Sequence, residues 1–189
     1  MPQLEWWQWA LGAGAAFMVG VAKTGVPGLG ILVVPMMVLA VGDARQSAGW
    51  LLPILCMADL FAVVYWRRHA AASRLFSLAP WVLLGMIGGA LALALPERSV
   101  RTLVACIVLL MLIAYFVRKM RPETSTPVAS APYGIAAGFA TTVANAAGPV
   151  MNLYLLSKRL SKEEFVATGA WFFFVVNLSK VPVYLWHGL

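Results

Sequence analysis

Three ionisable residues lie inside otherwise apolar stretches, and their chemistry is the strongest functional signal in the sequence. They are Lys23, Asp59 and Lys180. A charged side chain deep in a bilayer costs a few kcal/mol on insertion scales, so such residues form ion pairs or serve a function. A structural pair between Asp59 and one lysine is one interpretation, and a substrate site is the other. Two cations against one anion leave a net positive interior, which suits an anionic substrate.

Lys23 belongs to a stretch that interrupts an apolar run, "AKTGVPGLGI" at residues 22–31. Pro27 ends an incoming helix, and glycines allow the backbone to approach a ligand closely. The free N–H groups at the start of the following half-helix carry partial positive charge and bind anions. A simple kink at a close helix crossing is the alternative. The residues expected to bind substrate here are Lys23, Thr24, Gly25, Gly28 and Gly30.

A second interruption, "TTVANAAGP" at residues 141–149, offers similar groups later in the chain. Its hydroxyl and amide side chains add hydrogen-bond donors, and the lysine at position 180 adds a charge. We expect the two breaks to meet at one site near the bilayer midplane. The residues expected from this half are Thr142, Asn145, Gly148 and Lys180.

The composition of the chain predicts the structural elements that position these residues. The chain has 189 residues, of which 62% are hydrophobic and 11% are charged, whereas soluble domains carry about 25% charged residues. The apolar blocks are long enough to cross a bilayer repeatedly. They predict an all-α polytopic membrane protein, and the net charge of +7 is then explained by basic cytoplasmic loops rather than by nucleic-acid binding. The blocks are 6–41, 47–66, 75–95, 100–117, 132–156 and 165–186.

An internal repeat divides the chain. Shifting the sequence by 118 residues superimposes the two interrupted segments and places Asp59 opposite Asn177. The longest polar segment separates the copies. The expected organisation is a first repeat at 1–117, a cytoplasmic linker at 118–131 and a second repeat at 132–189.

The distribution of lysine and arginine predicts the orientation. If each broken segment enters and leaves on the same side, three loops with three basic residues each face the cytoplasm, nine against three outside. If each crosses once, the count is six against six, so the positive-inside rule favours the first arrangement. The two halves are then inverted relative to each other, as in many transporters. The expected cytoplasmic loops are 67–74, 118–131 and 157–164.

Other chemistries lack the residues they need. Two cysteines inside apolar runs and two histidines at helix ends form neither a metal motif nor a catalytic cluster. We therefore expect no enzyme activity, no metal and no cofactor. A nucleotide-binding motif is also absent, so transport would draw on an ion gradient or the substrate's own gradient. Asp59, with Asn177 as its neutral counterpart, is the candidate coupling or structural charge.

Two segments carry a resemblance to a known family. They are "GVAKTGVPGLGILVVPMMVLAVGDARQSAGWLLPILCMADLFAVVYWRRH" and the second copy "GFATTVANAAGPVMNLYLLSKRLSKEEFVATGAWFFFVVNLSKVPVY". Over about residues 10–186 the chain resembles the TauE/SafE family of sulfite and organosulfonate exporters. The resemblance implies a multi-pass carrier of the bacterial inner membrane that exports sulfite, sulfonates or related small organic anions.

The second repeat is shorter than the first. Counterparts of the two helices at 75–117 would fall at 193–235, beyond Leu189. We therefore expect a second half that lacks its last two helices. The expected partners of the protein are the small anion and the lipid bilayer. Formation of a homodimer is one way to complete the carrier. The alternative function is a non-transporting accessory subunit or a truncated, inactive carrier.

Overall fold

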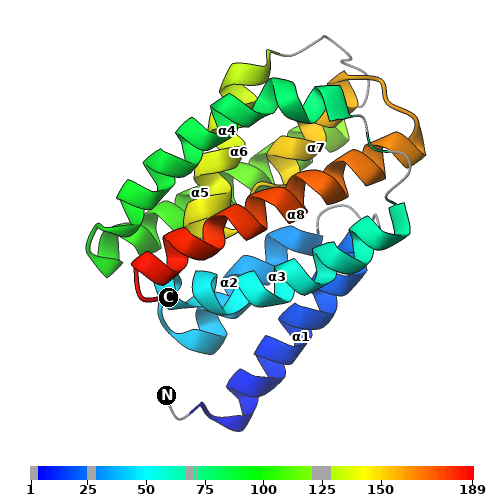
Figure 1. Cartoon of the computed structure of the whole chain (residues 1–189). Coiled ribbons are helices and arrows are strands. Elements are labelled where there is room, and N and C mark those ends of the chain that lie inside the picture. Colours follow the sequence, from blue (N-terminus) through cyan, green and yellow to red (C-terminus); the bar gives the residue numbers. More distant parts are fainter. Residues whose placement is uncertain (1–3, 25–28, 67–69, 71, 121–128) are drawn as a thin grey trace.

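A computed structural model describes residues 4–24, 29–66, 70, 72–120 and 129–189. These residues form eight helices and no strand (Figure 1). The predicted all-α fold is therefore confirmed for this part of the chain. The helices are α1 (Trp6–Lys23), α2 (Leu29–Val41), α3 (Ala44–Trp66), α4 (Ala72–Leu93), α5 (Glu97–Met120), α6 (Ser130–Ala144), α7 (Gly148–Ser157) and α8 (Lys162–Trp186).

Within the part of the chain that the structure describes, four helices are long and apolar enough to cross a membrane. Their candidate spans are Ala44–Trp66, Leu75–Leu93, Glu97–Val117 and Lys162–Trp186. Large apolar side chains such as Phe61 and Leu91 are 70% exposed, which lipid tolerates and water does not. The molecule is a multi-pass membrane protein.

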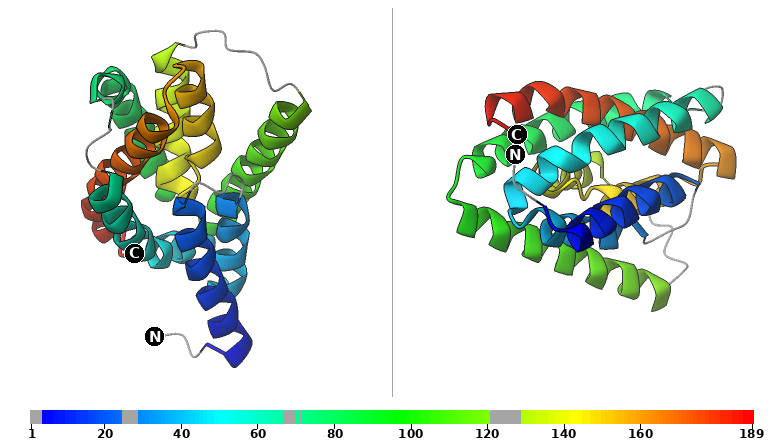
Figure 2. Two further views of the ribbon diagram at one scale, coloured as in Figure 1. Left: turned by 90° about the vertical axis from the view of Figure 1, so that its right-hand side faces the viewer. Right: turned by 90° about the horizontal axis from the view of Figure 1, so that it is seen from below.

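Both interrupted segments fold as broken helix pairs. α1 ends at Lys23 before α2 begins at Leu29, and α6 ends at Ala144 before α7 begins at Gly148. The pairs approach the middle of the molecule from opposite sides with their breaks toward each other (Figure 2). A long helix follows each pair, and α3 and α8 begin 118 residues apart, at 44 and 162.

A close crossing of α4 and α6 links the two halves of the chain. A Cβ atom added to Gly138 would lie 2.1 Å from the carbonyl oxygen of Val82, and one added to Gly85 would lie 2.2 Å from that of Ile135. Only glycine permits this separation, as is common where membrane helices cross. The crossing fixes α6, and therefore the second break, against the first half.

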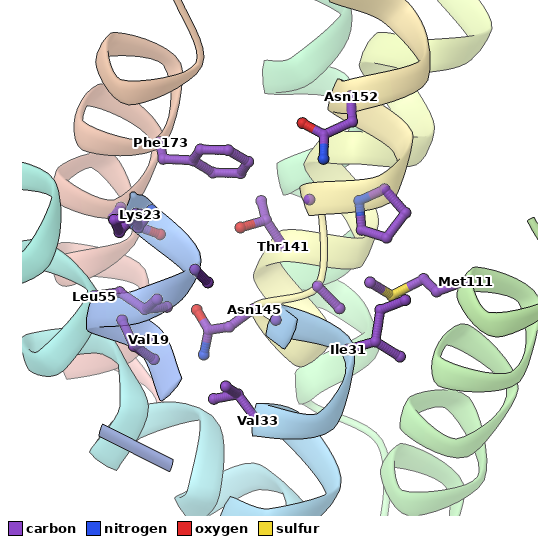
Figure 3. A pocket seen from close by; sticks show the side chains of 16 residues that line it. Val19, Lys23, Ile31, Val33, Leu55, Met111, Thr141, Asn145, Asn152 and Phe173 are labelled. Atoms are coloured by element: carbon purple, nitrogen blue, oxygen red, sulfur yellow. The ribbon is translucent and has the colours of Figure 1, made fainter. Parts of the chain in front are cut away.

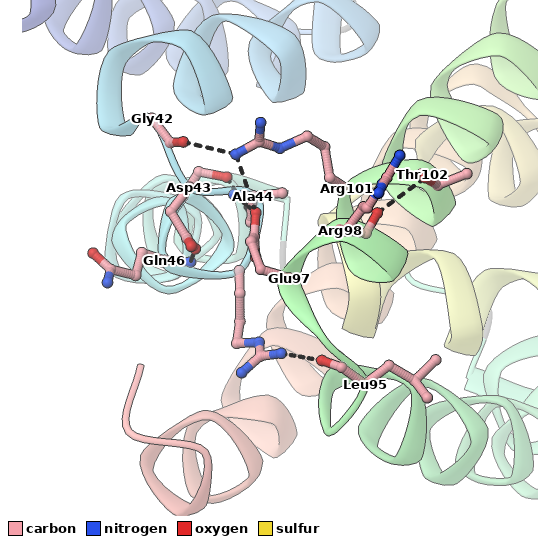
Figure 4. A network of polar contacts seen from close by, with 11 residues as sticks. Gly42, Asp43, Ala44, Gln46, Leu95, Glu97, Arg98, Arg101 and Thr102 are labelled. Atoms are coloured by element: carbon pink, nitrogen blue, oxygen red, sulfur yellow. Dashed lines mark hydrogen bonds and ion pairs between the residues drawn. The ribbon is translucent and has the colours of Figure 1, made fainter.

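A polar network joins two turns at one end of the bundle (Figure 4). Glu97, at the start of α5, accepts a hydrogen bond of 2.9 Å from the backbone N–H of Ala44 at the start of α3. Arg101 lies 3.6 Å from Glu97 and donates to the carbonyl oxygen of Gly42 at 3.1 Å. Gly42 has a φ of +82°, which favours glycine. The network holds the first turn of α3 in place.

Candidate functional site

A pocket of about 160 Å³ lies between the two helix breaks (Figure 3). One wall comes from the end of α1 and the start of α2, and the opposite wall from the end of α6 and the start of α7. α3, α5 and α8 complete it. The residues that line it are Val19, Ala22, Lys23, Gly30, Ile31, Val33, Leu55, Met111, Thr141, Asn145, Ala146, Gly148, Pro149, Asn152, Phe173 and Asn177.

Lys23 supplies the cation on the wall of the pocket. It is the last residue of α1, where a positive charge also opposes the negative end of the helix dipole. Its Nζ forms an ion pair with Asp59, and it lies 4.4 Å from the centre of the Phe173 ring. The side chain is 19% exposed, while that of Asp59 is fully buried. Lys23 is therefore the member of the pair that reaches the pocket.

Asp59 is held by a second group from the other half of the chain. The Nδ2 of Asn177, on α8, donates to Oδ2 of Asp59 at 2.5 Å. Asn177 is 2% exposed and lines the pocket. Its Oδ1 is buried and has no hydrogen-bond partner among the described residues. The amide thus stabilises the carboxylate and keeps one free acceptor.

Lys180 is fully buried and is bonded to neutral groups. Its Nζ donates to the carbonyl oxygen of Thr141 at 3.1 Å, to Oγ1 of Thr141 at 3.0 Å and to Oδ1 of Asn145. Among the described residues Asp59 is the single buried acid, and it is paired with Lys23 instead. The Nζ of Lys180 therefore lies directly behind two residues of the pocket wall, Thr141 and Asn145, without a paired carboxylate among the described residues.

Asn145 fixes the shape of the second break. It ends α6 in the left-handed conformation, with φ of 53° and ψ of 33°, which asparagine tolerates better than most residues. The next residue, Ala146, donates to the carbonyl oxygen of Ala140 at 3.1 Å and closes the helix end. The Asn145 Nδ2 donates to the carbonyl oxygen of Ala48 on α3 at 2.9 Å. Asn145 thus connects α6, α3 and α8.

The structure brings most of the predicted site residues together. Lys23, Gly30, Asn145 and Gly148 share the pocket, and Lys180 contacts it through Asn145. Their role in substrate binding remains a prediction. Gly25 and Gly28 lie outside the described residues.

Two predicted threonines point elsewhere. Thr24 is exposed, and its hydroxyl donates to the carbonyl oxygen of Val21 at 2.8 Å. Thr142 is fully buried, and its hydroxyl donates to the carbonyl oxygen of Gly138 at 2.9 Å. Neither lines the pocket, because both hydroxyls return to their own helices.

Some pocket residues were not singled out from the sequence. Asn152 lies four residues after Gly148, one turn along α7, so helical spacing offered a signal for it. Phe173 and Met111 come from α8 and α5, and only the packing of these helices brings them to the breaks. Among the described residues, no group of three His, Cys, Asp or Glu side chains is placed to hold a metal ion.

Comparison with known proteins agrees with this architecture. A family model described as "Sulfite exporter TauE/SafE" matches residues 11–189. No curated protein and no solved structure matches the chain. The family match and the apolar helices indicate a multi-pass membrane transporter of sulfite or related anions rather than an enzyme. The chain belongs to the TauE/SafE sulfite exporter family.

Proposed function

We propose that the protein is a secondary transporter that exports a small anion, such as sulfite or an organosulfonate, across the bacterial inner membrane. The substrate binds in the pocket between the α1–α2 break and the α6–α7 break. The proposal rests on the family match and on the charges around this pocket.

The observation that carries the proposal is the unbalanced charge. Two ammonium groups, Lys23 and Lys180, lie at or directly behind the pocket wall, while Asp59 is the one buried carboxylate among the described residues. Buried charges without a partner are unfavourable because the interior replaces water poorly. This surplus positive charge attracts a monovalent anion into the pocket. A neutral substrate is not attracted by it, and a cationic substrate is repelled.

The helix breaks add a second attraction for anions. The 13-residue α2 and the 10-residue α7 both begin at the pocket, where Gly30 and Gly148 form part of the wall. The amino end of a helix carries partial positive charge and N–H groups that lack helical acceptors. Two such ends across one cavity favour an oxyanion held between them.

The volume of the pocket limits the substrate. A pocket of about 160 Å³ has room for several water molecules. Sulfite or a sulfonate with one or two carbons fits this space. A larger sulfonate requires the walls to move. Apolar wall residues such as Leu55 and Met111 suit the carbon chain of a short sulfonate.

The broken helices also suggest how access alternates. The pocket lies between elements of the proposed first repeat, 1–117, and second repeat, 132–189. In transporters with inverted repeats, one half rocks against the other around a fixed site. We assign the two broken pairs this role, with an ion gradient or the substrate gradient as the energy source.

Uptake into liposomes tests the proposal. Purified protein is reconstituted, and entry of sulfite and of methanesulfonate is measured under an imposed gradient of each anion. We expect protein-dependent flux of at least one anion. Lys180→Met should abolish this flux, while the matched control Lys162→Met, at an exposed lysine in the first turn of α8, should retain it. Absence of flux in the wild type, or equal flux in both variants, contradicts the proposal and favours an accessory subunit.

A further inference from the structure

We propose that Asp59 is a proton-binding site, and that one proton is bound and released with each anion because the anion displaces Asp59 from Lys23. This inference rests on the proposed function and adds its coupling mechanism. It follows from three features of the pocket: a shared cation, a carboxylate with no replacement partner and an amide with a free acceptor.

Lys23 is shared between the carboxylate and the pocket. Its ammonium is paired with Asp59, yet its side chain lines the pocket and is partly exposed there. Asp59 itself is fully buried and is not part of the pocket wall. An anion that enters the pocket therefore meets the Lys23 ammonium first. It competes with Asp59 for the positive charge of the same ammonium, so strong binding of the anion weakens the ion pair.

Among the described residues, Asp59 forms an ion pair with Lys23 alone. The groups that face it from the described helices are Asn177 and Lys180 on α8, with Cys56 one turn away on α3. The Lys180 ammonium acts on Asp59 through space, but its hydrogen bonds go to Thr141 and Asn145 on α6. A carboxylate left without a close cation at this depth is unfavourable. Taking up a proton removes that charge.

Asn177 is suited to both protonation states of Asp59. Its Nδ2 donates to the carboxylate in the present arrangement, and its buried Oδ1 has no partner among the described residues. A carboxylic acid instead needs an acceptor for its own O–H. Rotation of the amide by half a turn offers Oδ1 to that proton. An amide therefore serves the carboxylate and the acid, whereas a lysine or an apolar residue serves one form at most.

The charges balance in each step. During export the anion and one proton enter the site together from the cytoplasmic side, and the outward gradient of the anion supplies the energy. The anion moves to the Lys23 ammonium, and the proton binds an oxygen of Asp59. On release at the other side, the anion leaves, the proton returns to water, and Asp59 pairs with Lys23 again. For a monovalent anion the loaded transfer carries no net charge. Transport should then respond to a pH gradient and not to the membrane potential.

Reconstituted full-length protein with methanesulfonate as the probe tests this, because its single negative charge does not change with pH near neutrality. We measure the accumulation of methanesulfonate at a fixed potassium–valinomycin potential, and separately under a pH gradient. The wild type should accumulate it about tenfold per pH unit and should be insensitive to potential. If only sulfite is transported, the same comparison is made with sulfite, and the difference between wild type and Asp59→Asn is the readout.

Asp59→Asn should uncouple the anion from the proton. Flux is expected to fall, but the remaining accumulation should follow the potential, by about 50-fold per 100 mV for one uncompensated charge, and should ignore the pH gradient. The control Glu163→Gln makes the same change at an exposed acid in the first turn of α8 and should keep the wild-type responses. If Asp59→Asn does not fold, the responses of the wild type to the pH gradient and to the potential still decide between coupled and uncoupled transport.

Three results separate this inference from the proposed function. Wild-type flux that follows the potential and not the pH gradient overturns proton coupling while leaving anion transport intact. Asp59→Asn that keeps the pH response also overturns it. Absence of methanesulfonate and sulfite flux in the wild type contradicts the proposed function itself.

Discussion

Asp59 and Asn177 form a hydrogen bond of 2.5 Å across 118 residues of sequence, the same separation that relates the two interrupted segments. Two residues at matching places in a repeat touch each other when they lie beside the axis that relates the copies. α3 and α8, which carry them, lie side by side (Figure 1). The contact therefore supports a two-fold axis between these helices, beside the proposed anion site.

The 118-residue offset places Lys23 opposite a residue that Lys180 contacts. The counterpart of Lys23 is Thr141, since 23 plus 118 is 141. Thr141 is the residue to which Lys180 donates two hydrogen bonds. Each broken pair therefore has an ammonium group at the same relative place, supplied by its own side chain in the first half and by α8 in the second.

Removing the pocket cation should damage transport more than folding. In Lys23→Met we expect anion flux to fall at least about tenfold, equivalent to about 1.4 kcal/mol, while the amount of protein in the membrane changes less than about twofold. The reason is that Lys23 faces the pocket, and Asp59 retains Asn177. Uptake assays and quantitative immunoblotting of membranes provide the two measurements. A parallel loss of flux and protein would identify a structural ion pair instead.

The positive charge of Lys180, next to the α6–α7 break, should decide whether the protein transports anions. Asn145→Asp places a carboxylate beside the Lys180 ammonium and cancels the surplus positive charge. We expect sulfite or methanesulfonate uptake to disappear. Asn145→Gly tolerates the left-handed conformation and removes both side-chain hydrogen bonds but leaves the charge, so it should retain measurable uptake. Uptake by Asn145→Asp equal to that of Asn145→Gly would show that charge is unimportant there.

The close crossing of α4 and α6 should tolerate no added methyl group. Gly138→Ala places a Cβ about 2.1 Å from the Val82 carbonyl oxygen, so the helices must separate, at a cost of about 1–3 kcal/mol. Gly88→Ala is the matched control, because its Cβ would meet only the Phe139 ring at 3.7 Å. Thermal unfolding in detergent should show a lower midpoint for the first variant alone. Equal midpoints would mean that the crossing is looser than described.

Cysteine labelling should establish the orientation. With Cys56 and Cys106 replaced, a membrane-impermeant thiol reagent applied to intact cells should modify Ser99→Cys, at an exposed position near the α4–α5 turn. It should not modify Ser73→Cys, in the first turn of α4, or Ser125→Cys. These positions lie in two of the three segments expected to face the cytoplasm, 67–74 and 118–131. Ser125 lies outside the described residues, so this part tests the charge count alone. Modification of either loop position from outside would reverse the topology.

The sequence by itself determined the membrane class, the approximate helix limits and the two breaks. It could do so because apolar length and helix-breaking residues act locally. The run at 145–149 contains the C-cap residue of α6, Asn145, and the first residue of α7, Gly148. The apolar residues next to Lys23, Asp59 and Lys180 in the sequence likewise identified these three as charges that need a partner.

Only the tertiary structure decided which partner each charge has. Both lysines were candidates for Asp59, and the packing of α1 against α3 gives it Lys23, while α8 directs Lys180 to α6. It also brought Phe173 to the pocket. Pairing depends on distances and directions between helices, and these are set by packing contacts distant in sequence, which no local pattern contains.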